Sequence, residues 1–185
     1  GNIQFDLNRY LFLDVTARND WSSTLPSPHS YFYPSIGISG VISDMIKLPD
    51  WISFGKVRAS YTQVGNDPDP YLLKQRYKFA LGANQGFIFR DSNKSIADLK
   101  PEKTKSFEIG LDWRFLNNRL TLDATVYKSN TINQLLYVGL PMASGYSRRY
   151  INAGDIENKG LEIQLGGRPI ETKNFSWNTT INFST

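Results

Sequence analysis

Apolar and polar residues alternate along most of this 185-residue chain, and this two-residue repeat predicts β-strands with one apolar and one polar face. In the clearest case, Phe107, Ile109 and Leu111 alternate with Glu108 and Asp112. Seven segments show the repeat: 11–18, 35–43, 56–62, 107–114, 119–126, 161–165 and 175–183. Residues 3–5 could add a stub of another strand. No segment has comparable helical spacing, so the sequence predicts an all-β, antiparallel fold.

The composition excludes several classes of protein. The chain has no Cys, which excludes a disulfide framework, a thiolate metal site and a Cys nucleophile. Its only His, His29, lies in a polar loop and offers little for a metal site or a catalytic triad. The net charge is +4 and the charges are scattered, so nucleic-acid binding has little support. No segment approaches the ~18 apolar residues of a membrane helix. We expect no enzyme activity, catalytic residue, metal or cofactor.

The connections between the predicted strands alternate in length. Long connections near 19–31, 65–103 and 139–149 alternate with shorter ones at 43–50, 115–118 and 167–174. Transmembrane β-barrels have short periplasmic turns and long extracellular loops, and a soluble sandwich has no reason to keep this order. We therefore expect the strands that start near Tyr10, Trp51, Arg119 and Phe175 to run toward the long loops. A soluble glycan-binding or adhesin module is the alternative.

Tryptophan and charge positions favour the membrane interpretation. Trp51, Trp113 and Trp177 all lie in the apolar phase, beside short turns, at the same predicted end. Indole rings prefer the membrane–water boundary, although these residues could also be ordinary core tryptophans. The charges of the seven segments fall in the polar phase. A Lys or Arg facing mid-membrane lipid costs about 2–4 kcal/mol, whereas a polar lumen accepts it.

The strand count predicts a piece of a larger barrel. Seven strands cannot close into a bacterial barrel, because such barrels have even strand numbers and leave no unpaired edge. We therefore expect an interior segment of about seven to eight strands. A complete eight-stranded barrel that includes the stub at 3–5 is the alternative.

Several motifs resemble a known family, the TonB-dependent outer-membrane transporters of the SusC/RagA type. The motifs are Arg-Asn-Asp-Trp-Ser-Ser at 18–23 with Tyr-Pro-Ser at 33–35, Lys-Val-Arg-Ala-Ser-Tyr at 56–61 with Val-Gly-Asn-Asp at 64–67, Leu-Lys-Pro-Glu-Lys-Thr at 99–104 with Glu-Ile-Gly at 108–110, and Asn-Ala-Gly-Asp-Ile-Glu-Asn-Lys-Gly-Leu-Glu at 152–162. The resemblance covers nearly the whole chain, in order, and its spacing fits the C-terminal half of the barrel.

The resemblance implies an architecture and a function. It implies a barrel of about 22 strands with a plug, of which residues 1–185 are a β-barrel segment without the plug and N-terminal domains. It also implies active import of glycans or peptides across the outer membrane of a Gram-negative bacterium of the Bacteroides group. The implied partners are outer-membrane lipid, a SusD-like surface lipoprotein as lid, and TonB through the missing N-terminal parts. Dimers of transporter–lid pairs follow by analogy.

Two carboxylate pairs could suggest acid–base chemistry, and one of them a calcium site. Asp67 and Asp69 lie between prolines in a loop, and Asp155 and Glu157 lie in the last family motif. We interpret both pairs as structural. A phosphate-binding turn at Gly82, Asn84 and Gly86 lacks the strand–loop–helix context that such a site needs.

We assign none of the remaining polar and aromatic residues to substrate binding. Sequons occur at Asn93, Asn174, Asn178 and Asn182, and we interpret the last three as lumen amides. Gly154 and Gly160 suit backbone geometry better than ligand contact. The 65–103 loop holds aromatic and amide side chains that could stack on sugars or a lid protein, or pack against neighbouring loops: Tyr71, Gln75, Tyr77, Phe79, Asn84, Gln85, Phe87 and Phe89.

Overall fold

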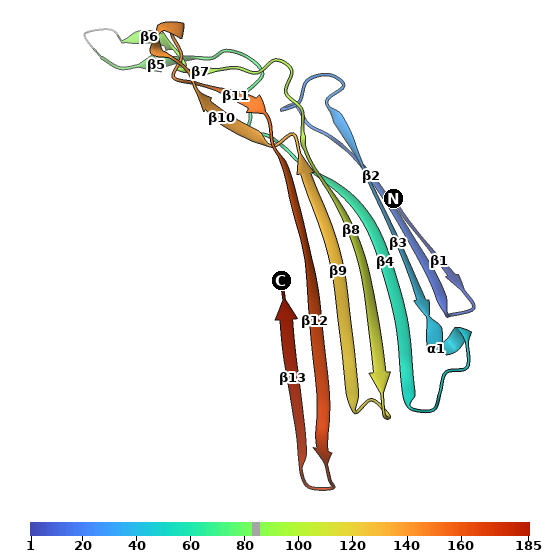
Figure 1. Cartoon of the computed structure of the whole chain (residues 1–185). Coiled ribbons are helices and arrows are strands. Elements are labelled where there is room, and N and C mark those ends of the chain that lie inside the picture. Colours follow the sequence, from blue (N-terminus) through green and yellow to red (C-terminus); the bar gives the residue numbers. More distant parts are fainter. Residues whose placement is uncertain (83–85) are drawn as a thin grey trace.

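The computed structural model describes residues 1–82 and 86–185, and its main element is one open antiparallel sheet (Figure 1). The eight strands of this sheet are β1 (Asn2–Leu7), β2 (Leu11–Trp21), β3 (Ser30–Val41), β4 (Ile52–Asn66), β8 (Glu102–Phe115), β9 (Leu120–Ile132), β12 (Asp155–Glu171) and β13 (Ser176–Ser184). They lie in the order β1-β2-β3-β4-β8-β9-β12-β13, so each strand pairs with the next sheet strand along the chain. The all-β antiparallel prediction is therefore confirmed.

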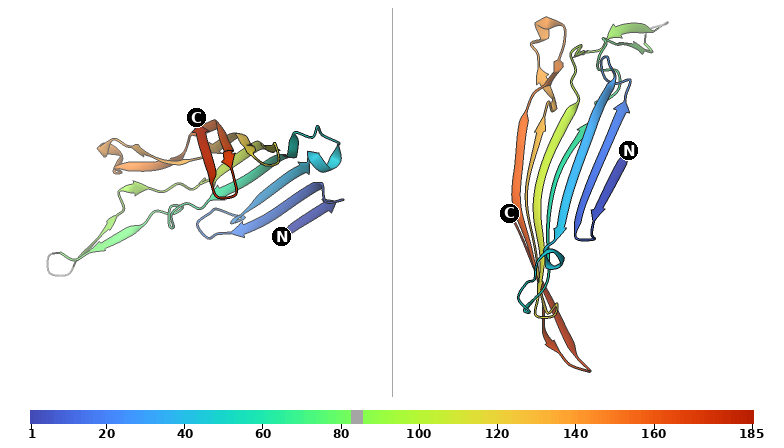
Figure 2. Two further views of the ribbon diagram at one scale, coloured as in Figure 1. Left: turned by 90° about the horizontal axis from the view of Figure 1, so that it is seen from below. Right: turned by 90° about the vertical axis from the view of Figure 1, so that its right-hand side faces the viewer.

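The long and short connections lie at opposite ends of the sheet, as their alternation predicts (Figures 1 and 2). One end carries the turns 8–10, 116–119 and 172–175 and the short helix α1 (Ile42–Met45). The asparagines at 117 and 118 have positive φ angles of 56° and 63°, which suits the tight turn predicted there. The helix was not predicted, because four residues are too few to show a helical repeat.

The prediction of about seven to eight strands is confirmed, and the alternative to it is wrong. The stub at 3–5 is a six-residue strand, β1, which pairs along its whole length with β2. The alternative of a complete eight-stranded barrel is wrong, because β1 and β13 lie at opposite edges of an open sheet. None of the helices within residues 1–82 and 86–185 is long and apolar enough to cross a membrane.

The strand register places apolar residues in continuous rows on one face of the sheet, which we call the apolar face. One row crosses seven strands at Phe5, Leu13, Ile38, Ala59, Ile109, Val126 and Leu161. Large side chains of this row are well exposed; Phe5 and Val126, for example, are both 58% exposed. Within residues 1–82 and 86–185, the apolar face is thus open to its surroundings and is not packed against a second sheet, unlike the inner face of a sandwich.

The opposite face, which we call the polar face, is hollowed. Two shallow cavities of about 220 and 360 Å³ lie on it, and polar-phase side chains such as Arg58, Glu108 and Glu162 line them. The views in Figure 2 show the curvature of the sheet. A curved sheet with a polar hollow side and an apolar exposed side has the form of a barrel wall.

The two longest loops contain secondary structure of their own. The first holds β5 (Tyr77–Ala80), β6 (Phe87–Arg90) and β7 (Asn93–Lys94), and the second holds β10 (Leu135–Gly139), η1 (Met142–Ser144) and β11 (Arg148–Asn152). β5 and β6 form a hairpin, and β10, β11 and β7 form a three-stranded sheet. The sequence patterns did not predict these elements, which are two to five residues long.

Candidate functional site

Arg58 is the centre of a polar contact that spans three strands of the polar face. Its guanidinium, on β4, reaches across β8 and donates hydrogen bonds of 2.9 and 3.2 Å to the Asp123 carboxylate and of 2.7 Å to the Thr125 hydroxyl, both on β9. The path across β8 is open because residue 110 is Gly. A Cβ atom there would lie 2.5 Å from Nε of Arg58. Gly110 therefore permits a paired, fork-like contact that holds the wall in register.

Replacement of Gly110 by Ala should break this contact. The new methyl group would overlap the guanidinium, so Arg58 would have to leave Asp123 and Thr125. Because Arg58 and Asp123 are each about two-fifths exposed, we expect a loss of only about 1 kcal/mol in the free energy of unfolding of the full-length protein in urea. Gly37→Ala is the matched control on the same face, where the nearest atom is 3.9 Å away. Equal midpoints for the two variants would contradict the prediction.

Amide side chains at the C-terminal edge lie on the polar face, in agreement with their interpretation as lumen amides. The Asn182 amide oxygen accepts a 3.0 Å hydrogen bond from Gln164, and that of Asn178 accepts one of 3.1 Å from Arg168. Asn174, by contrast, lies in the turn between β12 and β13 and outside both strands, so its interpretation as a lumen amide is wrong.

The described residues of 67–101 and 133–154 form one unit, which we call the loop assembly. The strands β7 and β11 join its two parts through parallel pairing, with Arg148 opposite Asn93, and the Arg148 guanidinium donates a 2.7 Å hydrogen bond to the Asn93 amide oxygen. A small apolar core supports this junction: Leu72, Ile96 and Leu99 are buried, and Leu73, Leu135 and Tyr150 pack against them. The longest loops of the chain are therefore folded onto each other.

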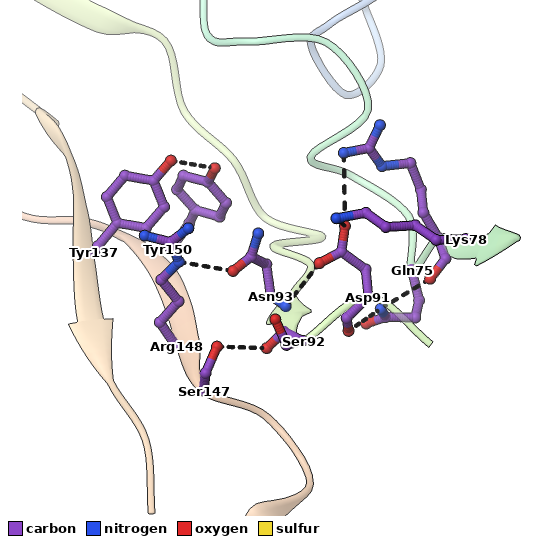
Figure 3. A network of polar contacts seen from close by, with 10 residues as sticks. Gln75, Lys78, Asp91, Ser92, Asn93, Tyr137, Ser147, Arg148 and Tyr150 are labelled. Atoms are coloured by element: carbon purple, nitrogen blue, oxygen red, sulfur yellow. Dashed lines mark hydrogen bonds and ion pairs between the residues drawn. The ribbon is translucent and has the colours of Figure 1, made fainter. Parts of the chain in front are cut away.

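Asp91 anchors the first part of the loop assembly (Figure 3). Its side chain is almost fully buried, accepts a 3.0 Å hydrogen bond from the backbone N–H of Asn93, and lies 3.1 Å from the Lys78 ammonium and 3.8 Å from the Arg76 guanidinium. The Asn93 N–H, followed by Lys78, lowers the pKa of the Asp91 carboxyl below its usual value, although burial opposes the shift. The carboxylate thus joins the β5–β6 hairpin to β7.

Two tyrosines stabilise the second part. The hydroxyl groups of Tyr137 on β10 and Tyr150 on β11 are 2.6 Å apart and hydrogen-bonded, and the ring centroids are 4.3 Å apart (Figure 3). Burial and this hydrogen bond raise the pKa of Tyr150 to about 12. The Arg148 guanidinium lies 4.5 Å from the Tyr137 ring centroid. Tyr150 is therefore neutral at physiological pH, and the pair is a structural contact.

The last family motif begins with a residue that holds three segments together. The Asn152 amide donates to the carbonyl oxygens of Lys100 and Asn133, and its oxygen accepts the backbone N–H of Lys100. Gly154 follows with φ of 99°, a backbone conformation that favours Gly, and a Cβ at Gly160 would overlap the Tyr127 ring. The sequence places Asn152 in the motif but does not predict that it joins these three segments.

The suspected carboxylate pairs are dispersed among other contacts. Glu157 lies 2.8 Å from the Lys128 ammonium and 3.6 Å from that of Lys159. Asp67 and Asp69 lie in the segment between β4 and β5. No group of three or more His, Asp or Glu side chains that could hold a metal ion occurs in the part of the chain that the structure describes.

The aromatic residues of the first long loop are mostly exposed. Tyr71, Tyr77 and Phe79 are between 63% and 70% exposed, whereas Phe87 and Phe89 are 55% and 41% exposed and have ring centroids 5.9 Å apart. Gly82 and Gly86 flank the connection of the β5–β6 hairpin, and Gly86 donates a 2.9 Å backbone hydrogen bond to Gly82. Asn84 and Gln85 lie outside the described residues. The hairpin thus carries aromatic rings on both of its faces, with Tyr77 and Phe79 on one face and Phe87 and Phe89 on the other.

Comparisons with known proteins agree with this geometry. The family model for the TonB dependent receptor-like β-barrel matches residues 1–185. The chain is 34% identical to TonB-dependent receptor P3 of Formosa agariphila and 30% identical to TonB-dependent receptor SusC of Bacteroides thetaiotaomicron. Both matches cover all of this chain but only 19% and 20% of the relatives, so the chain spans about a fifth of their length.

Solved structures show the same arrangement of strands. The chain superimposes on the RagAB peptide transporter with a TM-score of 0.87 and 25% identity, over 99% of this chain and 21% of that one. The siderophore receptor PirA from Pseudomonas aeruginosa gives a TM-score of 0.64 at 17% identity, over 100% of this chain and 33% of that one, which shows likeness of fold alone.

Proposed function

This chain belongs to the TonB-dependent receptor β-barrel family, and on that premise we propose that it forms part of the wall of an outer-membrane importer of nutrients. Barrels of this family are outer-membrane proteins of Gram-negative bacteria. In the proposed orientation the apolar face contacts lipid, the polar face contacts the plug and the transported substrate, and the loop assembly lies outside the cell. The exposed apolar rows of the sheet are the observation that carries this proposal.

The extent of the apolar face supports membrane contact. On β8 it runs from Phe107 to Phe115, a length of about 26 Å, or about 20 Å after a strand tilt of about 40°. A transmembrane barrel has an apolar band about 25 Å tall. Aromatic rings mark its lower edge, where the Phe115 ring stacks on those of Trp51 and Trp113 at centroid distances of 5.7 and 6.3 Å.

Charged residues mark the upper edge of the same face. On each of β8, β9 and β12, a lysine follows the apolar residues toward the loops and lies on the same face as they do. These lysines are Lys105, Lys128 and Lys159. Lys128 pairs with Lys159, and Lys105 lies two residues further toward the loops. A switch from apolar to basic side chains near the loop end of three adjacent strands suits the change from acyl chains to headgroups.

The transported material and the partners follow from the family. We propose glycans or peptides as substrates, a SusD-like surface lipoprotein as lid, TonB as the source of energy through other parts of the whole protein, and dimers of transporter–lid pairs. The host would be a bacterium of the Bacteroides group. The exposed aromatic hairpin β5–β6 lies where a lid protein would sit, and its rings suit a protein contact or a sugar ring.

The test is fractionation and uptake with the full-length protein in a Bacteroides-type host. We expect the protein in the outer membrane, extracted only by detergent, and co-purified with a surface lipoprotein. A deletion strain should lose growth on an oligomeric nutrient but keep growth on its monomer. Recovery of the protein from the soluble fraction without detergent would refute the proposal.

A further inference from the structure

A cavity of about 380 Å³ lies between the two parts of the loop assembly, and its charged lining is mostly basic. Lys94 and Lys100 come from the first part and Arg149 from the second, and Asp98 is the one acidic residue among them. Tyr150 and Asn152 also line the cavity. Its volume falls in the range of about 300–1,000 Å³ that is typical of ligand pockets.

The three cations of this cavity have no acidic partner among the described residues. The ion pairs of the described chain do not include Lys94, Lys100 or Arg149, nor does Asp98 take part in one. The ammonium group of Lys94 lies 5.9 Å from the Tyr146 ring centroid, which is a distant contact.

Other cations of the loop assembly, by contrast, have close partners. Lys78 pairs with Asp91, and the guanidinium groups of Arg90 and Arg148 donate hydrogen bonds to Gly145 and Asn93. The lining of the cavity is therefore distinct in charge, because it holds three cations and one acid and none of the four is in an ion pair within the described chain.

The backbone that carries these cations is fixed on both sides. Asn152 ties the backbone of Lys100 to that of Asn133, and β7–β11 pairing places Arg149 opposite Lys94. The backbone positions of the three cations therefore cannot separate without breaking the loop assembly. Like charges held together in this way repel each other, and an entering anion relieves that repulsion.

We propose that this cavity binds an oxyanion group, a carboxylate or a sulfate, carried by the transported oligomer. The inference rests on the proposed import function and adds a substrate class to it: acidic oligomers bind in preference to neutral ones of the same length. Arg149 supplies a planar fork for two oxygens, and the two lysines supply point charges. Asn152 remains a structural residue, because its amide is already engaged.

The experiment is calorimetric titration of the full-length transporter in detergent. The probes are a hexamer of galacturonate (carboxylate), a κ-carrageenan hexasaccharide (sulfate without carboxylate), maltohexaose (neutral) and hexa-aspartate (peptide carboxylates). We expect at least one acidic oligomer to bind about tenfold or more tightly than maltohexaose, and the preference to shrink when NaCl is raised. The first two probes separate carboxylate from sulfate recognition, and the peptide separates a glycan source from a peptide source.

Matched variants locate the effect. Lys94→Gln with Arg149→Gln should weaken binding of the acidic probe about tenfold or more, because two charges that face the oxyanion are lost. Lys47→Gln with Lys173→Gln removes the same charge at the opposite end of the sheet and should leave binding unchanged. Native folding of both is checked by the heat-dependent mobility of the barrel on gels.

The outcomes are separable from those of the import proposal. Equal affinity for acidic and neutral oligomers, no binding of any probe, or equal losses in the two double variants would overturn the oxyanion site. None of these results bears on membrane location or on uptake of the nutrient, which the fractionation and growth experiment measures.

Discussion

Arginine in place of Ile163 should sharply reduce the amount of folded barrel in the membrane. Ile163 lies at mid-height of the apolar face on β12, between Ala124 of β9 and Phe183 of β13. An Arg that faces the middle of the bilayer costs about 2–4 kcal/mol, a large share of the ~5–15 kcal/mol that keeps a typical protein folded. We expect a lower urea midpoint in liposomes and less heat-modifiable barrel in isolated outer membranes.

The control is the next residue along the same strand. Gln164 points to the polar face, where its side chain donates a hydrogen bond to Asn182. Gln164→Arg introduces the same side chain into a polar, hydrated surface, so its loss should be limited to that one hydrogen bond, about 1 kcal/mol. If Ile163→Arg and Gln164→Arg unfold at the same urea concentration, then the apolar face does not contact lipid.

The sheet could be predicted because its information is local. A two-residue repeat fixes which side chains share a face, and long loops that alternate with short turns fix the direction of each strand. The row through Leu13, Ile38 and Ile109 is the direct result. The length of β1 was underestimated: Ile3, Phe5 and Leu7 do alternate with Gln4 and Asp6, but a repeat this short becomes a strand through its pairing with β2.

The loop assembly could not be predicted for the opposite reason. β7 contains two residues, and its parallel pairing with β11 joins positions 55 apart in the chain, such as Arg148 and Asn93. No local pattern encodes such a contact. In the sequence, nothing distinguishes Asp91 from other acidic residues in loops. Only the fold shows that Lys78 and Arg76 are its partners.

The candidate functional residues also divide into those that the sequence could predict and those that it could not. The amides at 178 and 182 followed the strand repeat, and the structure places both in hydrogen bonds across the β12–β13 pair. The role of Asn152 needed the positions of Lys100 and Asn133, which come from two other segments. A family motif can therefore include a structurally important residue such as Asn152 without indicating what its side chain contacts.

Asp91→Asn should loosen the loop assembly while the barrel stays folded. The amide can still accept the Asn93 N–H, but the buried negative charge that pairs with Lys78 and Arg76 is lost. Both cations are about half exposed and regain water, so we expect a loss of about 1–2 kcal/mol, which is a roughly tenfold rise in local opening. Hydrogen exchange across 86–101 in the full-length protein measures this opening. Asp98→Asn, which removes an exposed acid without an ion pair from the same segment, should leave it unchanged.

The pH dependence of this anchor has a definite sign. The pKa of Asp91 is lowered in the folded state, chiefly by the Asn93 N–H and then by Lys78, so its contribution is complete above the ordinary Asp value of about 3.9 and is lost as the pH falls through the lowered value. The equilibrium constant for opening of the loop assembly, measured by hydrogen exchange with the intrinsic pH dependence of exchange divided out, should therefore be low and constant from pH 6 to about pH 4 and should rise below it. In Asp91→Asn, opening should already be frequent at pH 6 and should lack that rise. A wild-type protein whose opening increases between pH 6 and 5 would show that another group controls the loops.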